Sequence, residues 1–224
     1  MNIKKISFSG FWLLSFFSGF IFKGITQVSY DFAIPLPPEG KVVNAISDRY
    51  FGLYSSVRTN VNYEFNAEGV YVVSLNFNSI SRTLIRESST YRVSNGWLHG
   101  VLKNDSIPCE LEGEYYHFAV KNRVLLNGEN SAHVLTKLNE RTYMLNFEDA
   151  GHFTPSIFEF KGSELHVSHF NYEDGTHLFD VISEQRERKE GNLTSVTLLP
   201  TKNEWKRLSL EAILGESENY TKKE

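Results

Sequence analysis

The stretch at residues 61–77, VNYEFNAEGVYVVSLNF, decides the fold class. Large apolar side chains recur at every second position on both sides of a short polar segment, residues 66–69, which ends in a glycine. A period of two is typical of a strand with one buried side, and the polar segment is typical of a turn. The stretch therefore predicts an antiparallel hairpin with one apolar and one polar face.

The same alternation continues toward the C-terminus. Asn95-Gly96 is a strong signal for a tight hairpin turn. In residues 142–148 we expect one set of side chains in the core and the other in solvent. The expected core set is Tyr143, Leu145 and Phe147, and the expected solvent set is Thr142, Met144, Asn146 and Glu148.

About ten strands follow one another through short connections, which predicts an all-β fold with antiparallel neighbours. A long meander with one apolar face closes into a barrel or folds into a two-sheet sandwich, and both remain open. Thr201 and Glu204 have the spacing of a capping box, so a short C-terminal helix is expected within residues 201–215.

The chain divides into four predicted parts. Residues 1–27 are a signal peptide or an N-terminal membrane anchor, and residues 28–46, with three prolines, are an extended spacer. Residues 47–215 form the all-β domain with its helix, and residues 216–224 form a polar tail. Within the domain, the mixed-charge run at residues 185–191 is expected to be a solvated loop.

The first residues indicate where the protein resides. Lys4 and Lys5 precede the uncharged, aromatic-rich residues 6–22, the layout of a secretory signal or anchor. The positive charge at the N-terminus predicts that the bulk of the chain lies outside the cytoplasm. Cleavage after the leader and retention of residues 6–22 in the membrane are both open.

Composition excludes several function classes. The formal net charge of −4 argues against a dedicated nucleic-acid binder. A single cysteine, Cys109, excludes an intramolecular disulfide framework and a cysteine-only zinc site. No phosphate loop, nucleophile elbow or zinc-protease motif is present, so we expect no cofactor, no metal and no catalytic residue. The hydrolase alternative rests on His152 with Glu148, or on residues 166–177, which contain three histidines.

The aromatic residues of the strands allow two interpretations. They fill the core, or they line a barrel with room for a small apolar ligand. We expect a filled interior without a cavity for a drug-sized molecule, because few small residues occupy inward positions. The rings that would contact a ligand are Tyr63, Tyr71, Tyr91, Trp97 and Tyr143.

Gly52-Leu53-Tyr54 opens the first predicted strand of the domain, a meander follows, and a helix comes last. This layout resembles the lipocalin-like (calycin) β-barrels, in which a Gly-x-Trp commonly stands at that place. Here Tyr54 replaces the Trp, and the disulfide of many members cannot form. The resemblance implies export and binding of a small apolar molecule, and it carries no binding residue over to this chain.

The function expected from the sequence is that of a non-catalytic envelope or surface protein that binds another protein. A carrier of a small apolar ligand and a hydrolase are the alternatives. An exposed aromatic patch with a filled interior favours the first, a deep cavity the second, and a concave cluster of histidines and carboxylates the third.

The predicted topology can be tested with a reporter that is active only outside the cytoplasm, fused after Pro38. We expect activity with the full leader and none when residues 1–26 are deleted, because the uncharged run directs export. Activity without the leader, or inactivity with it, contradicts the topology.

Overall fold

The computed structural model describes residues 27–102, 105–171, 176–191, 193–208 and 210–223. The predicted leader lies almost entirely outside these residues. Strands make up 58% and helices 11% of the structure, so the all-β prediction is confirmed. The sheet has sixteen strands in the described part of the chain and is not closed, which excludes a closed barrel.

The elements occur in the following order along the chain. The strands are β1 (Gln27–Phe32), β2 (Lys41–Val42), β3 (Gly52–Ser55), β4 (Val61–Asn66), β5 (Gly69–Ser81), β6 (Arg92–Ser94), β7 (Trp97–Leu102), β8 (Asp105–Glu112), β9 (Tyr115–Gly128), β10 (Val134–Lys137), β11 (Thr142–Asp149), β12 (His152–Lys161), β13 (Glu164–His169), β14 (Gln185–Glu190), β15 (Leu193–Leu198) and β16 (Glu218–Lys222). The helices are η2 (Asp48–Tyr50), α1 (Arg82–Glu87), η3 (Thr176–Val181), α2 (Lys202–Trp205) and α3 (Leu210–Ile213).

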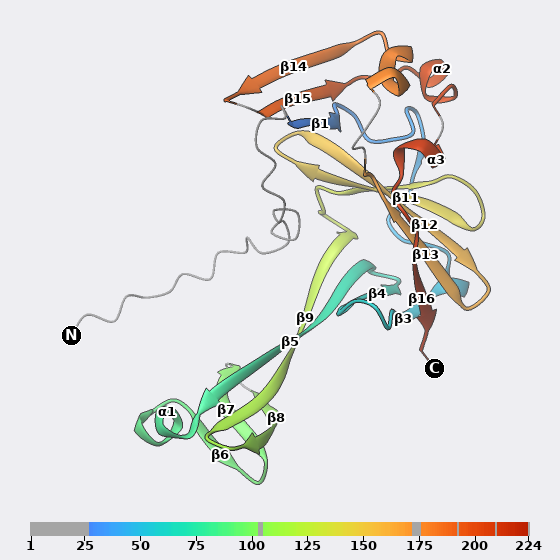
Figure 1. Ribbon diagram of the computed structural model, residues 1–224. Coiled ribbons are helices and arrows are strands. Elements are labelled where there is room, and N and C mark those ends of the chain that lie inside the picture. Colours follow the sequence, from blue (N-terminus) through green and yellow to red (C-terminus); the bar gives the residue numbers. More distant parts are fainter. Residues whose placement is uncertain (1–26, 103–104, 172–175, 192, 209, 224) are drawn as a thin grey trace.

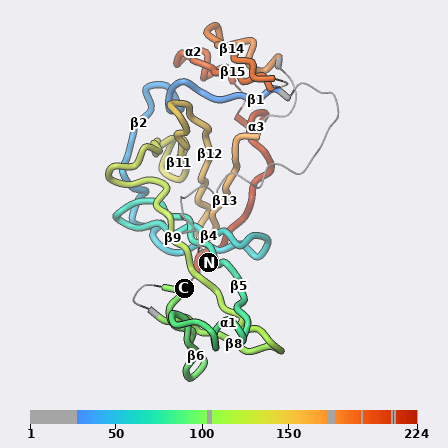
Figure 2. Tube along the Cα trace, turned by 90° about the vertical axis from the view of Figure 1, so that its left-hand side faces the viewer, coloured from blue at the N-terminus to red at the C-terminus, as the bar shows by residue number. Residues whose placement is uncertain are grey.

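Three parts are visible in Figure 1. The central sheet runs β2-β10-β11-β12-β13-β16-β3-β4-β5-β9 through antiparallel pairs. A second layer, β14-β15-β1 with η3, α2 and α3, covers one face of β11 and β12, and β1 pairs with β15 in parallel. The far half of the β5–β9 ribbon carries β8, β7, β6 and α1 away from the body. Figure 2 shows this extension and the second layer at opposite ends of the molecule.

The two faces of the central sheet build two cores. The first core contains the rings of Tyr54, Tyr63, Phe65, Tyr143, Phe158, Phe160 and Tyr220, among other residues. Most pairs of these rings meet edge-on, as Tyr63 does with Phe158 at 5.1 Å between centroids, while Tyr63 and Phe65 are stacked. The second core joins the other face of the sheet to β1, β15, η3, α2 and α3 through Phe32, Leu36, Met144, Phe179, Leu198 and Ile213.

The second core corrects the predicted register of β11. Tyr143 and Leu145 are buried in the first core and Phe147 packs against it, as expected. Met144 and Asn146, predicted to face solvent, are both 0% exposed. The prediction was wrong at these two positions because the second layer covers the face that a single-core sheet would leave in water.

Two segments expected to lie outside the folded domain belong to it. Within residues 28–46, most of β1 joins the sheet and Leu36 is fully buried, since it fills the second core. In residues 216–224, β16 lies between β13 and β3, where the ring of Tyr220 contacts Tyr63 in the first core. Within residues 185–191, expected to be a loop, Gln185–Glu190 form edge strand β14 and Gly191 lies in a turn. The predicted helical region contains the short α2 and α3, and the Thr201 capping box is confirmed.

Asn146 links the two layers. Its amide oxygen accepts the Leu36 N–H at 2.8 Å, and its amide nitrogen donates to the carbonyl oxygens of Leu36 at 2.9 Å and Val134 at 3.2 Å. The side chain therefore satisfies main-chain groups on both sides of a buried junction, which would otherwise be desolvated without partners.

We predict that Asn146→Ala lowers the free energy of unfolding by about 2–4 kcal/mol, because it leaves buried main-chain groups of Leu36 unpaired. The control is Asn122→Ala on the exposed part of β9, with an expected cost of under about 0.5 kcal/mol. Denaturant unfolding of both variants gives the comparison. Equal costs would show that the Asn146 contacts do not hold the layers together.

Candidate interaction surface

The residues from Gly69 to Gly128 form a projecting arm. Strands β5 and β9 pair along their whole length, from Gly69 opposite Gly128 to Ser81 opposite Tyr115. Strand β4 pairs with β5 only as far as Ser74, so the ribbon leaves the body there. The seven residues 75–81 extend it by about 23 Å at the usual strand rise. The base of the arm belongs to the first core through Val70, Val72 and Leu126, and Figures 1 and 2 show its outer part reaching away from the body.

The tip of the arm is a small subdomain with its own core. Strands β8, β7 and β6 add to the outer end of β9. Ile80, Leu98 and Ile107 are buried there. Asn95 and Gly96 both have positive φ, 51° and 78°, at the turn between β6 and β7, as the sequence predicts. The register places Ile80, Leu98 and Ile107 on one face of these strands, opposite to the face of Phe77.

Most of the large apolar side chains that are exposed in the described residues lie on the arm. Nine of the twelve large apolar side chains exposed in the described residues lie on it, although it holds only residues 69–128. Apolar surface gathered on one projection is typical of an interaction site. The nine are Leu75, Phe77, Leu84, Trp97, Leu102, Leu111, Tyr115, Val124 and Leu125.

Four of these side chains share one face of the arm. Leu75 and Phe77 alternate with Asn76 along β5, so their side chains lie on one face. The strand register places Tyr115 on β9 and Trp97 on β7 on that same face. We call Leu75, Phe77, Trp97 and Tyr115 the aromatic face. Phe77 is 73% exposed, and the other three are 41–51% exposed. A shallow depression of about 230 Å³ lies beside Phe77, lined also by Asn78, Ser79, His117 and Phe118.

The five aromatic residues suggested as ligand contacts do not line one pocket. Tyr63 and Tyr143 are buried in the first core. Tyr71 lies under the Arg123 guanidinium at the base of the arm, while Tyr91 and Trp97 lie near its tip. The structure therefore separates them into three places.

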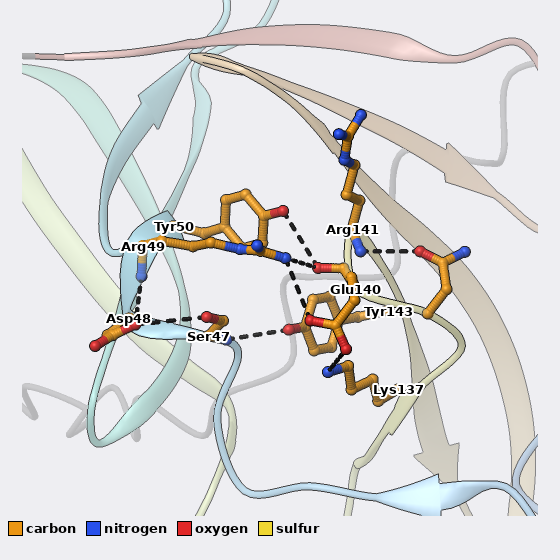
Figure 3. Close-up of polar contacts among 9 residues, drawn as sticks. Ser47, Asp48, Arg49, Tyr50, Lys137, Glu140, Arg141 and Tyr143 are labelled. Carbon is orange, nitrogen blue, oxygen red and sulfur yellow. Dashed lines mark hydrogen bonds and ion pairs between the residues drawn. The ribbon is translucent and has the colours of Figure 1, made fainter.

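The hydroxyl of Tyr143 has a structural partner. It accepts the Ser47 N–H at 3.1 Å, next to a polar cluster that holds η2 against the β10–β11 turn (Figure 3). In that cluster Lys137 Nζ lies 2.7 Å from Glu140 Oε1, and Arg49 donates to the Glu140 carbonyl. The hydrogen bond from Lys137 lowers the pKa of Glu140. These contacts fix a loop at the rim of the first core.

The histidines of the hydrolase alternative are dispersed. His152 contacts Asp31 at 3.1 Å, whereas the Glu148 carboxylate accepts the Gly151 N–H at 2.7 Å, so these two residues do not form a pair. His166 lies beside Glu164 and His177 beside Asp180, each at the surface.

His169 and Ser156 do meet. The His169 Nδ1 lies 2.8 Å from Ser156 Oγ, and burial lowers the pKa of the imidazole. Ser156 is only 2% exposed, so a substrate carbonyl cannot reach its hydroxyl group. The hydrogen bond between Ser156 and His169 is therefore a structural contact of the buried part of the sheet. No group of three or more His, Cys, Asp or Glu within the described ranges is arranged to hold a metal ion.

Comparisons with protein-family models, with curated proteins and with solved structures gave no match for this chain. Among the helices that the structure describes, none combines the length and apolar character needed to cross a bilayer.

A side-chain clamp fastens the base of the arm. Arg123 on β9 donates two hydrogen bonds to the Glu64 carboxylate on β4, at 2.8 and 3.1 Å. Its guanidinium lies 3.4 Å from the centroid of the Tyr71 ring on β5. The hydrogen bonds from Arg123 lower the pKa of Glu64. Three strands are thereby joined where the ribbon leaves the body, which helps to fix the direction of the arm.

We predict that Glu64→Gln lowers the melting temperature near neutral pH by about 2–4 °C, equal to about 1 kcal/mol for a chain of this size. Because the Glu64 pKa is lowered by folding, its contribution is present above the ordinary value and is lost as the pH falls through the lower folded-state value. The melting temperatures of variant and wild type should therefore converge in acid.

Glu110→Gln on the exposed side of β8 is the matched control, with melting temperatures equal to wild type throughout. A constant difference between Glu64→Gln and wild type across the acidic range would contradict an ion-pair role for Glu64.

Proposed function

We propose that the chain is an exported or membrane-tethered, non-catalytic protein that binds another protein through the aromatic face of its arm. The observation that carries this proposal is the contrast between two groups of aromatic side chains. The rings of the first core pack against one another, whereas Phe77, Trp97 and Tyr115 remain exposed on the projection.

The chemistry of the aromatic face suits a protein partner. Trp and Tyr are enriched among the residues that dominate binding energy at protein interfaces, because each supplies a large contact area with few rotatable bonds. By register, Glu110 and His117 lie between Tyr115 and Phe77 on the same face, and Glu112 lies opposite Tyr115. Polar groups beside the rings can form the hydrogen bonds that a protein interface also contains.

The interior supports this function over the carrier alternative. Phe65 contacts Phe158 and Phe160, with centroids 6.0 and 5.3 Å apart, and Tyr54 contacts Phe65 at 5.5 Å. Rings in mutual contact occupy the volume that a small apolar ligand would need. The proposal of export rests on the leader alone, where Lys4 and Lys5 precede the uncharged residues 6–22.

We predict that a photoreactive phenylalanine analogue at Trp97, in the full chain within the producing cells, yields a crosslinked product with a second protein species. The same analogue at Leu193 should yield none, although Leu193 is 56% exposed, because Leu193 belongs to β15, which lies at the opposite end of the molecule from the tip of the arm (Figure 2). Electrophoresis after irradiation measures both products.

Tyr115→Ser in the Trp97-labelled chain removes a neighbouring ring and should reduce the product by about tenfold, a loss typical of an interface anchor. Equal products from the two labelled positions, or a product indifferent to Tyr115→Ser, would refute binding by the aromatic face.

A further inference from the structure

The outer edge of β5 along residues 75–79 is open. Its main-chain pairing within the described residues is with β9 alone, because the pairing of β4 with β5 ends at Ser74 and α1 begins after Ser81. In an antiparallel strand, alternate residues direct both main-chain groups to the same side. This edge therefore presents a row of donors and acceptors that can accept a further strand.

The other open edges carry protecting charges. Strand β14 is exposed along its whole length and reads QRERKE, with an ion pair between Arg188 and Glu190. The edge of β9 beyond its pairing with β8 carries Lys121 and Arg123. Strands β2 and β6 have two and three residues and contain Lys41 and Arg92. Charge and short length are the usual means by which edge strands avoid pairing.

The β5 edge lacks each of these protections. Residues 75–79, LNFNS, contain no charge and no proline, and Phe77 at their centre is 73% exposed. The register shift between β5 and β9 lies at the base of the arm, opposite Val70 and Tyr71, so no bulge interrupts residues 75–79. One contact covers part of it, because Asn78 Nδ2 donates to the Asn76 carbonyl oxygen at 2.8 Å.

We propose that a second copy of this chain adds its own β5 to this edge, antiparallel across a two-fold axis at Phe77. This register sets Phe77 against Phe77 of the partner, Leu75 against Ser79 and Asn76 against Asn78. The aromatic pair is favourable in such a position, and an uncharged segment brings no like charges together when it meets itself. The two arms then form one continuous sheet.

The lack of charge, together with a sequence that matches itself across Phe77, favours a second copy as the occupant. A strand with charged side chains would find no complementary group along residues 75–79, whereas an identical uncharged strand matches both the main chain and the side chains. Five paired residues from each copy form an interface smaller than the roughly 1,200–2,000 Å² of stable complexes, so the dimer depends on concentration. The Asn78 to Asn76 contact opens when the strands pair.

This inference goes beyond the proposed function, since it concerns the edge of β5 and not the partner of the aromatic face. The test is sedimentation velocity of the purified full chain over a series of concentrations. We expect wild type to move from monomer to dimer. Phe77→Lys and Phe77→Glu should each weaken the dimer by at least about tenfold, because each sets like charges directly opposite across the axis.

An equimolar mixture of Phe77→Lys and Phe77→Glu should restore dimerisation, since Lys then meets Glu. Leu193→Lys, an equally drastic change at an exposed site off the arm, should leave the dimer unchanged. Circular dichroism establishes that all variants remain folded, as expected for a side chain exposed to this degree.

The inference is overturned if the wild-type chain stays monomeric at every concentration. It is also overturned if both Phe77 variants dimerise as wild type does, or if the mixture of the two variants does not dimerise. If a Trp97 crosslink to another protein persists while wild type is monomeric, the proposed function stands and the inference fails. If wild type dimerises as expected while the Trp97 position captures no other protein, the inference stands and the proposed function fails.

Discussion

The side-chain amide of Asn146 is the buried polar contact that joins the two layers, beside the apolar second core and the pairing of β1 with β12. It lies at 0% exposure on β11 and bonds both main-chain groups of Leu36, which follows β1. Since β1 pairs with β15, this contact connects the central sheet to the whole second layer. With that layer in place, β11 and β12 are covered on both faces, and nine of the twelve exposed large apolar side chains among the described residues lie on the arm.

The alternation of apolar residues predicted individual strands well and their layers poorly. Tyr143 and Leu145 occupy the expected core, and the Asn95-Gly96 turn forms as expected. The burial of Met144 could have been suspected, because an apolar run on adjacent positions is typical of a strand covered on both sides. The placement of β16 between β13 and β3 could not have been predicted from the alternation. It depends on pairing with residues more than 150 positions away, such as Ser55 opposite Thr221.

Local alternation also fails to predict which residues of β5 are buried and which are exposed. Val73 and Phe77 lie on the same side of β5 within one unbroken alternation, yet they are 3% and 73% exposed. Both positions satisfy the local pattern of a core residue. Their difference comes from β4, whose pairing with β5 ends at Ser74, and from the absence of a covering element farther out among the described residues. Burial on an arm is set by its distant neighbours and not by its own sequence.

The base of the arm fixes how its surface is presented. Gly69 has φ +145°, and a Cβ there would lie 1.8 Å from the Asn127 carbonyl oxygen, so the main chains of β5 and β9 approach as only glycine allows. The extra residue of the adjoining bulge, Leu126, is buried in the first core. The arm is therefore anchored by main-chain geometry as well as by the Arg123 clamp. A surface held in one orientation loses little conformational entropy when it binds, and modest exposed area can then suffice for recognition.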